Sequence, residues 1–368
     1  MKNSKNIEPG VDFSEKIAKE IDKIEKRNFK VYFFVYDTKG VPNASLSYIY
    51  ETALTLHNFG YKVRMMYSEE PDEGFVGVSE WLGDKYKVLK HVSVESRPQV
   101  SMSDFLFIPE IHPSVMYQTR SLPCKRVAII QNYAHLMDML QPGTDITSYG
   151  ITDCITTSEA MRERIKEVFP KMRISLVKPL VDEIFCKPTE PKKMIVNVIS
   201  KYKKDSNEIV KSFYLRYPQY KWVCFREVYG LSKEDYSELL KEGVITVWAD
   251  TDTSIGMSAL EAMACGNIVI GKIPENIPDW MIDEKGIKMN FIGFNTNREA
   301  VTYIAAGIHN YINYVDLSYI EKSADETLSE FTREEFNKSV DEVYVKGYFS
   351  ERLTLLTRMM DEGTAANN

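Results

Sequence analysis

A single carboxylate inside an apolar helix is the feature of this sequence that most strongly suggests chemistry. Residues 251–275 read TDTSIGMSALEAMACGNIVIGKIPE, and Glu261 lies among Met, Ala, Leu and Cys. A carboxylate with such neighbours needs hydrogen-bond donors, which the hydroxyl groups of a sugar or a ribose would supply. The alternative is a core helix with one solvated glutamate, and the local pattern does not decide between the two.

The turn before this helix has the composition of a phosphate-binding site. It contains Asp252, Thr253, Ser254, Ile255, Gly256 and Met257. The first amides of a helix lack intrahelical partners and lie at the positive end of its dipole, so a turn of Thr, Ser and Gly suits an anion. Gly256 would let the backbone approach a phosphate closely, and Gly266 would end the helix.

Alternating strand and helix patterns must position these residues. A continuous apolar run at 30–36, KVYFFVY, has the length of a strand covered on both faces, and a turn, a helix pattern and another strand follow it. Further strands are expected at 104–109, 125–130 and 153–157. A proline-rich stretch at 178–191 precedes a second unit that repeats this order. We therefore predict an α/β protein with two doubly wound domains that face each other across a cleft.

The composition of the chain narrows the classes of function. Its 368 residues carry a net charge of -7, which gives no general attraction to nucleic acid or anionic lipid. The five cysteines are scattered, and no signal peptide or membrane-spanning run is apparent. We therefore expect a soluble cytoplasmic protein. The basic segment 161–178 leaves peripheral contact with the inner face of a membrane as an alternative, although Glu163 and Glu167 favour a solvated helix face.

Beyond the carboxylate itself, the segment TSIGMSALEAMACGNIVIG resembles the donor-site signature of retaining glycosyltransferases of the GT-B fold, in particular glycosyl transferase group 1, family 4. The match is most specific at LEAMACG, residues 260–266. Segments 153–165, 179–188 and 231–256 also resemble the family. The resemblance implies two Rossmann-like domains: an acceptor-side domain at 1–185, joined by a C-terminal helix at 331–360, and a donor-binding domain at 190–330.

The resemblance implies roles for residues of the donor side. By spacing, Glu261 takes the place of the glutamate that holds the ribose, and Lys204 takes the place of the lysine that neutralises the diphosphate. Thr253 replaces a glutamate that holds the sugar, and the adjacent Asp252 is an alternative residue for this role. The family also has an arginine that is missing here, and Lys201 or Arg226 would restore its charge.

The resemblance also implies an acceptor side in the first domain. Gln131 stands where the family often has a histidine, and Asn132 and His135 follow it. The glycine-rich turn of the family is reduced to Gly40. Glu110 follows another strand, at the edge where cleft residues emerge. Ordinary surface positions are an equal alternative for Glu110 and His135.

The implied activity is transfer of a sugar, with retention, from a nucleotide sugar to a hydroxyl group of a glycan or a lipid-linked acceptor. No metal or other cofactor is expected, because a lysine, a second cation and helix amides would stabilise the leaving diphosphate. The Asp-x-Asp sequence at 250–252 is a competing metal-binding motif, but three-residue matches are common by chance.

Other functions are weighed against this activity. The acceptor could be a hydroxylated base in phage DNA, although the net charge of -7 argues mildly against DNA. A non-catalytic, glycosyltransferase-like partner subunit is a further alternative, because Thr253, Gln131 and the missing arginine depart from the family pattern. A dinucleotide-dependent oxidoreductase is disfavoured, since no Gly-x-Gly-x-x-Gly follows residues 30–36.

Overall fold

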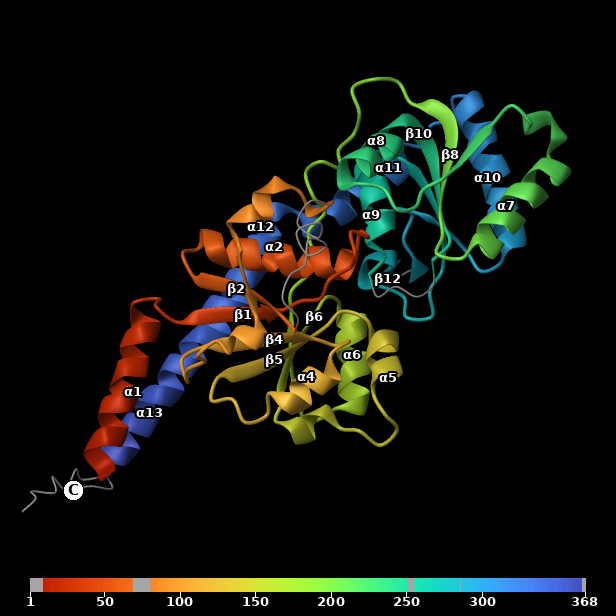
Figure 1. Cartoon of the computed structure of the whole chain (residues 1–368). Coiled ribbons are helices and arrows are strands. Elements are labelled where there is room, and N and C mark those ends of the chain that lie inside the picture. Colours follow the sequence, from red (N-terminus) through yellow and green to blue (C-terminus); the bar gives the residue numbers. More distant parts are fainter. Residues whose placement is uncertain (1–8, 69–80, 251–254, 285, 366–368) are drawn as a thin grey trace, which may run out of the picture.

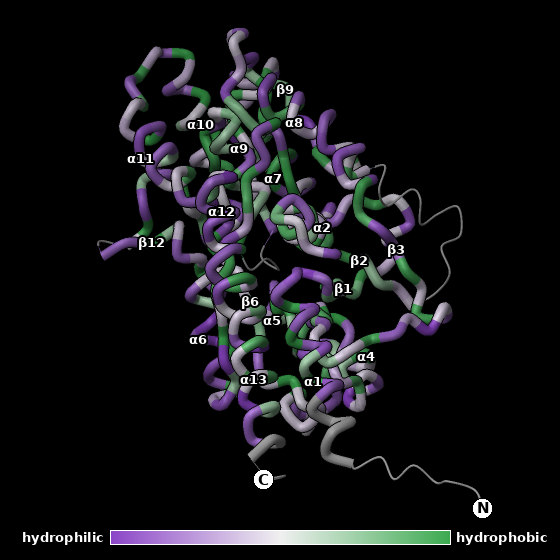
Figure 2. Tube along the Cα trace, turned by 90° about the vertical axis from the view of Figure 1, so that its left-hand side faces the viewer, coloured by the Kyte–Doolittle hydropathy of each residue, from purple (hydrophilic) through white to green (hydrophobic). Residues whose placement is uncertain are grey.

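Two lobes, each built on a parallel sheet, make up the molecule (Figure 1). The computed structural model describes residues 9–68, 81–250, 255–284 and 286–365. Hydrophobic stretches gather inside both lobes, whereas outer helices such as α6 (Glu159–Val168) and α11 (Ser318–Leu328) are largely hydrophilic (Figure 2). Among the described residues, no helix combines the length and the apolar character that crossing a bilayer requires.

The sheet of the first domain has seven parallel strands in the order β3-β2-β1-β4-β5-β6-β7. Its strands are β1 (Lys30–Phe34), β2 (Lys62–Tyr67), β3 (Lys90–Ser93), β4 (Phe105–Pro109), β5 (Lys125–Ile130), β6 (Asp153–Thr156) and β7 (Arg173–Leu176). Its other helices are α1 (Pro9–Glu25), α2 (Ala44–Asn58), α4 (Pro113–Gln118) and α5 (Tyr133–Met139). The inner strands are apolar on both faces because packed residues cover both sides of the sheet.

The sheet of the second domain has five parallel strands in the order β14-β11-β10-β8-β9. Its strands are β8 (Lys193–Ile199), β9 (Cys224–Glu227), β10 (Gly243–Trp248), β11 (Ile268–Lys272) and β14 (Ile292–Phe294). Its helices are α7 (Lys203–Arg216), α8 (Lys233–Glu242), α9 (Met257–Ala264), α10 (Asn297–Ile312) and α11. A short antiparallel hairpin of β12 (Ile282–Asp283) and β13 (Gly286–Ile287) follows β11.

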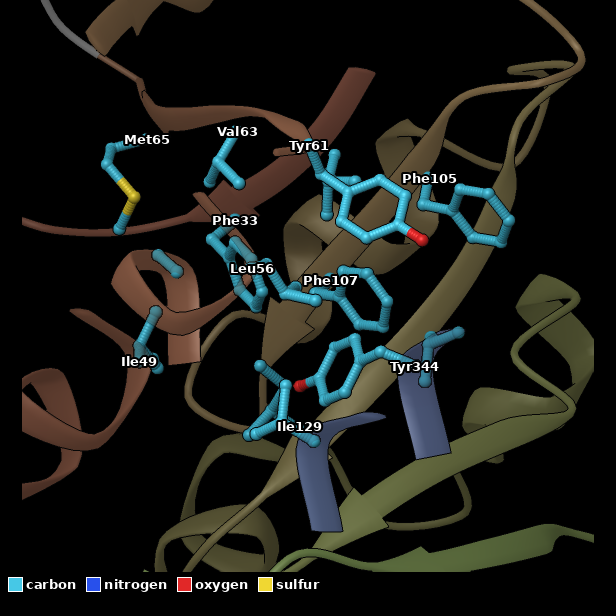
Figure 3. Close-up of a cluster of buried hydrophobic side chains, with 14 of the residues drawn as sticks. Phe33, Ile49, Leu56, Tyr61, Val63, Met65, Phe105, Phe107, Ile129 and Tyr344 are labelled. Atoms are coloured by element: carbon cyan, nitrogen blue, oxygen red, sulfur yellow. The ribbon is translucent and has the colours of Figure 1, made fainter. Parts of the chain in front are cut away.

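The C-terminal segment returns to the first domain. It comprises α12 (Arg333–Val340), a π-helical stretch (Asp341–Phe349) and α13 (Ser350–Ala365), and α13 lies beside α1 (Figure 1). The ring centroid of Tyr344 lies 4.8 Å from that of Phe107 and 6.2 Å from that of Phe33, in the cluster of buried side chains on the sheet (Figure 3). Burial of these aromatic rings joins the end of the chain to the core of its first domain.

A carboxylate of the second domain caps a helix of the first. Asp279 accepts hydrogen bonds from the backbone N–H groups of Glu159, at 2.7 Å, and Ala160, at 3.0 Å. These are the first residues of α6, where a negative charge is favoured by the helix dipole. The contact therefore links the two lobes directly.

The segment that links the domains is anchored by Lys192. Its ammonium group donates to the carbonyl oxygens of Leu240 and Lys241, each at 3.1 Å, and of Gly243, at 2.8 Å. These carbonyls lie at the C-terminal end of α8, where a cation is favoured by the helix dipole.

We expect Lys192→Met to lower the free energy of unfolding by about 2 kcal/mol, because three carbonyl groups lose a charged donor. Urea denaturation measures this loss. The matched control is Lys193→Met, since Lys193 forms only an exposed ion pair with Glu242 at 2.6 Å. That variant should lose less than about 1 kcal/mol. Equal losses in the two variants would contradict the anchoring role.

Candidate functional site

A cleft of about 410 Å³ lies between the two domains. Residues of both domains line it, including Asn43, Ser45, Gln131 and His135 from the first and Lys201, Lys233, Asp250, Gly256, Met257, Ser258 and Glu261 from the second. Several of these residues follow the carboxyl ends of β5, β8 and β10. In parallel α/β sheets, ligands bind at this edge, where the strand order reverses.

The reversal point of the second sheet lies between β8 and β10. Lys201 follows β8, and its backbone N–H donates to the carboxylate of Asp250, which follows β10, at 2.6 Å. Both residues line the cleft, and the side chain of Lys201 is exposed. The contact fixes the two loops against each other, and Lys201 lines the same cleft as Met257 at the start of α9.

Two tryptophans pack against Ile255 and Gly256, the last residues before α9. Gly256 is the N-cap residue with φ 71° and ψ 47°, in the left-handed region that favours glycine. A Cβ atom at this position would lie 3.0 Å from the ring of Trp248. The indole N–H of Trp280 donates to the carbonyl oxygen of Ile255 at 2.6 Å. Glycine is therefore favoured at position 256 by the backbone conformation and by the packing of Trp248 behind it.

Glu261 lies one turn inside α9 and its side chain lines the cleft. Burial raises the pKa of this carboxyl group to about 7, and the charge of Lys233 and the hydroxyl group of Tyr236 act in the opposite direction. Met257 and Ser258, whose amides begin α9, line the same cleft. A partly buried carboxylate beside the start of a helix can accept hydrogen bonds from ligand hydroxyls while the helix amides hold an anion.

The structure separates the predicted cations. Lys201 lines the cleft, but Lys204 is exposed on the first turn of α7 and is not among the cleft residues. Arg226 pairs with Glu242 at 2.6 Å and also donates to the Asn197 side chain. Because this pairing holds the guanidinium group away from the cleft, it argues against the predicted phosphate role of Arg226.

Lys233 is a cleft residue that sequence reasoning missed. It is the first residue of α8, after the N-cap Ser232, and its ammonium group pairs with Asp182 at 3.0 Å. A signal was present, because Ser232 marks a helix start soon after β9, whose carboxyl end lies at the same sheet edge as that of β8.

The predicted acceptor-side residues occupy different places. Gln131 lines the cleft and donates to the carbonyl oxygen of Ser45 at 3.0 Å. Asn132 caps α5, and its side chain accepts from the backbone N–H groups of Ala134 and His135. Gly40 lies in a turn that does not line the cleft.

A second chamber of about 350 Å³ continues from the cleft into the first domain. It shares Asn43, Ser45, Gln131 and His135 with the cleft and is further lined by Tyr36, Ile49, Pro109, Glu110, Ile111 and Met139. Glu110 is only 2% exposed and accepts a hydrogen bond from the backbone N–H of Asn132 at 3.1 Å. Burial raises the pKa of Glu110 to about 7, although backbone donors favour its ionised form. The chamber thus offers polar groups and an apolar wall to a ligand.

Three predicted donor-site residues, Asp252, Thr253 and Ser254, lie outside the described residues. Of the competing metal motif at 250–252, the structure therefore describes Asp250 alone. Within the described ranges, no group of three or more His, Cys, Asp and Glu side chains is arranged to hold a metal ion.

Comparison of the sequence with known proteins shows similarity to a distant relative. No family model matches the chain. The chain is 23% identical over 223 residues to an alpha-1,6-glucosyltransferase of Actinobacillus pleuropneumoniae serotype 7 (strain AP76). The alignment covers 55% of this chain and 66% of the relative, just under two thirds of its length.

Comparison with solved structures gives matches that cover a larger part of this chain than the sequence match does. The pneumococcal O-GlcNAc transferase GtfA in complex with UDP and GlcNAc superposes with a TM-score of 0.60, 9% identity and coverage of 91% of this chain and 99% of that chain. TarM superposes with a TM-score of 0.63 and 10% identity, and the match covers 86% of this chain and 98% of TarM. Anabaena Alr3699/HepE in complex with UDP and glucose superposes with a TM-score of 0.61 and 11% identity, and the match covers 86% of this chain and 100% of that chain. The chain therefore has the GT-B fold, which confirms the predicted fold class.

Proposed function

We propose that this protein is a glycosyltransferase that binds a uridine diphosphate sugar in the cleft and transfers the sugar to a hydroxyl acceptor. The observation that carries the proposal is the convergence of Glu261, the start of α9 and Lys201 at the reversal point of the second sheet. Two of the three similar structures reported above, those of GtfA and HepE, are complexes with UDP. The relative that is named a glucosyltransferase makes UDP-glucose the first donor to test.

Each group in the donor site has a distinct role in this proposal. Glu261 accepts hydrogen bonds from the ribose hydroxyls. The amides of Met257 and Ser258 and the ammonium group of Lys201 stabilise the negative charge that develops on the diphosphate as the bond to the sugar breaks. Gly256 lets the diphosphate approach the backbone closely.

We propose that the transfer proceeds with retention and without a metal ion. The support is the sequence resemblance around residues 253–271, together with a donor site that supplies its own positive charge. The departing phosphate would take the proton of the acceptor, so no protein nucleophile is required. Turnover that is unchanged by a chelator, and a product with the anomeric configuration of the donor in NMR spectra, are the expected results.

The second chamber is the proposed place for a hydroxyl group of a glycan or a lipid-linked acceptor. It continues directly from the cleft, and Glu110, Gln131 and His135 offer polar groups along its wall. Sugars combine hydroxyl groups with apolar ring faces, which suits a chamber that also contains Ile49 and Met139.

Thermal unfolding with a panel of nucleoside diphosphates, followed by an assay of UDP release from UDP-glucose, tests the proposal. UDP at one hundred times its Kd should stabilise the protein by about 2.7 kcal/mol. UDP release should increase when a glycan acceptor is added. Absence of stabilisation by every common nucleotide would overturn the proposal, whereas binding without turnover would favour the non-catalytic alternative.

We expect Lys201→Met to weaken UDP binding about tenfold, because a cation beside the diphosphate is lost, which corresponds to about 1.4 kcal/mol. Isothermal titration calorimetry measures the change. Lys204→Met is the matched control: this lysine lies three residues further along the chain but does not line the cleft, so its loss should leave the affinity nearly unchanged. A larger effect at Lys204 than at Lys201 would contradict the site as described.

A further inference from the structure

A side chain of the second domain is bound to the start of α6 in the first. The carboxylate of Asp279 accepts hydrogen bonds from the backbone N–H groups of Glu159, at 2.7 Å, and Ala160, at 3.0 Å. The N-cap residue Ser158 accepts from the backbone N–H of Met161 at 3.2 Å. The first amides of α6 therefore donate to acceptors from both domains, and the acceptor from the second domain carries the charge that the helix dipole favours.

The residue after Asp279 reaches the turn into α9. The indole N–H of Trp280 donates to the carbonyl oxygen of Ile255 at 2.6 Å. Ile255 precedes Gly256, the N-cap residue of α9, and a Cβ atom at Gly256 would lie 3.5 Å from the ring of Trp280. Two consecutive side chains thus join a contact with the first domain to a contact with the turn into α9.

The short segment that carries both side chains is held at several points within the second domain. It forms a 3-10 turn (Asp279–Met281), and Trp280 is only 3% exposed. The ring of Trp280 meets Phe291 edge to face, with centroids 5.6 Å apart. Its carbonyl oxygen accepts from the side chain of Asn290 at 3.0 Å, and Asn290 also donates to the hydroxyl group of Thr327 on α11 at 2.8 Å. Because closely packed interiors transmit strain, this segment can couple its two contacts.

The connection runs behind the wall of the cleft. Asp279 and Trp280 are not among the described residues that line the cleft. Ile255 and Gly256 line it on the side of the second domain, and Thr157, in the loop before α6, lines it on the side of the first. Asp279 and Trp280 can therefore affect a ligand in the cleft only through the residues that they hold in place.

We propose that Asp279 and Trp280 are positioning residues of the nucleotide site, which together hold the turn into α9 in place against the first domain. This inference rests on the proposed function, because it assumes that the turn into α9 binds the diphosphate. It extends that function by making the orientation of the amides at the start of α9 depend on a contact between the domains. A site that is held in its binding orientation before the ligand arrives has a smaller ordering cost.

The first test is UDP affinity, measured by calorimetry in the full chain. Asp279→Ala removes the contact with α6 and should weaken UDP binding about fivefold, although this side chain lies outside the cleft. Glu275→Ala is the matched control, because this carboxylate is exposed and belongs to the same loop, and its affinity should be nearly unchanged. Asp279→Asn keeps an oxygen that can cap the helix, so it should recover most of the affinity.

A double-mutant cycle tests whether the effect of Asp279 passes through Trp280. Trp280→Phe keeps an aromatic ring but lacks the N–H that donates to Ile255, and it should weaken UDP binding about tenfold. If Asp279 acts through this hydrogen bond, the variant with both Asp279→Ala and Trp280→Phe should also lose about tenfold, whereas independent effects would multiply to about fiftyfold. Thermal unfolding without nucleotide checks that each variant is folded. The comparison of Asp279→Ala with Asp279→Asn and Glu275→Ala remains decisive even if Trp280→Phe does not fold.

The outcomes separate this inference from the proposed function. If the wild type binds no nucleotide, the proposed function fails and the inference falls with it. If the wild type binds UDP but Asp279→Ala binds it as tightly as Glu275→Ala does, or if the two losses multiply in the double variant, the inference alone is overturned. A loss in Asp279→Ala that Asp279→Asn restores, and that adds nothing to the loss in Trp280→Phe, supports it.

Discussion

Replacement of Glu261 with Gln is expected to weaken UDP binding about 100-fold at pH 8. The ribose hydroxyls would lose a charged acceptor, and hydrogen bonds to charged groups contribute about 1.5 to 3 kcal/mol each. Gln has the same shape, so the loss reports the charge and not a cavity. Calorimetric titration with UDP measures it, and unchanged thermal unfolding without nucleotide shows that the fold is intact.

The pH dependence provides an internal control for this variant. Because burial raises the pKa of Glu261 to about 7, the carboxyl group is largely neutral at pH 6 and largely ionised at pH 8. The wild type should therefore lose affinity relative to the variant as the pH falls through 7. A constant ratio of the two affinities between pH 6 and pH 8 would show that Glu261 does not contact the nucleotide as an anion.

Replacement of Glu110 with Gln is expected to abolish a loss of about 3 kcal/mol in the free energy of unfolding that the wild type undergoes as the pH rises. Burial raises the pKa of Glu110 from 4.5 to about 7 in the folded protein. Between these two values the unfolded chain loses the proton while the folded protein keeps it, so the wild type loses stability as the pH rises. Each pH unit in this window is worth about 1.4 kcal/mol. Above pH 7 the loss is complete and stays constant.

Urea denaturation at pH 5 and pH 8 measures this effect. The Glu110→Gln variant lacks the titrating group but keeps an oxygen for the backbone N–H of Asn132. Its stability relative to the wild type should therefore improve by about 2 to 3 kcal/mol between the two pH values. Glu95→Gln, at an exposed glutamate, is the control and should run parallel to the wild type. If the stability of Glu110→Gln changed with pH in parallel with that of the wild type, the raised pKa of buried Glu110 would be contradicted.

The start of α9 and the place of Glu261 within it could be predicted from the sequence because the residues concerned are close together along the chain. Gly256 and Glu261 are five residues apart, so one helix start fixes their relation and no distant contact has to be known. The alternation of strands and helices likewise predicted the two sheets. The reason for Gly256 was not visible, because Trp248 and Trp280 come from other elements and meet only in the fold.

Features that depend on distant residues or on turns could not be predicted. Lys204 had the matching spacing, but it is exposed on the first turn of α7 and does not line the cleft, whereas Lys201, offered for a different charge, precedes α7 and does. The pairing of Asp182 with Lys233 joins residues 51 positions apart, which no local pattern reveals.

A crystal structure of the protein in complex with UDP is the most direct test of the central claim. The account predicts that the ribose hydroxyls lie within hydrogen-bond distance of the Glu261 carboxylate and that the diphosphate lies at the start of α9, near Lys201. UDP bound elsewhere, or bound in the cleft with its ribose turned away from Glu261, would contradict it.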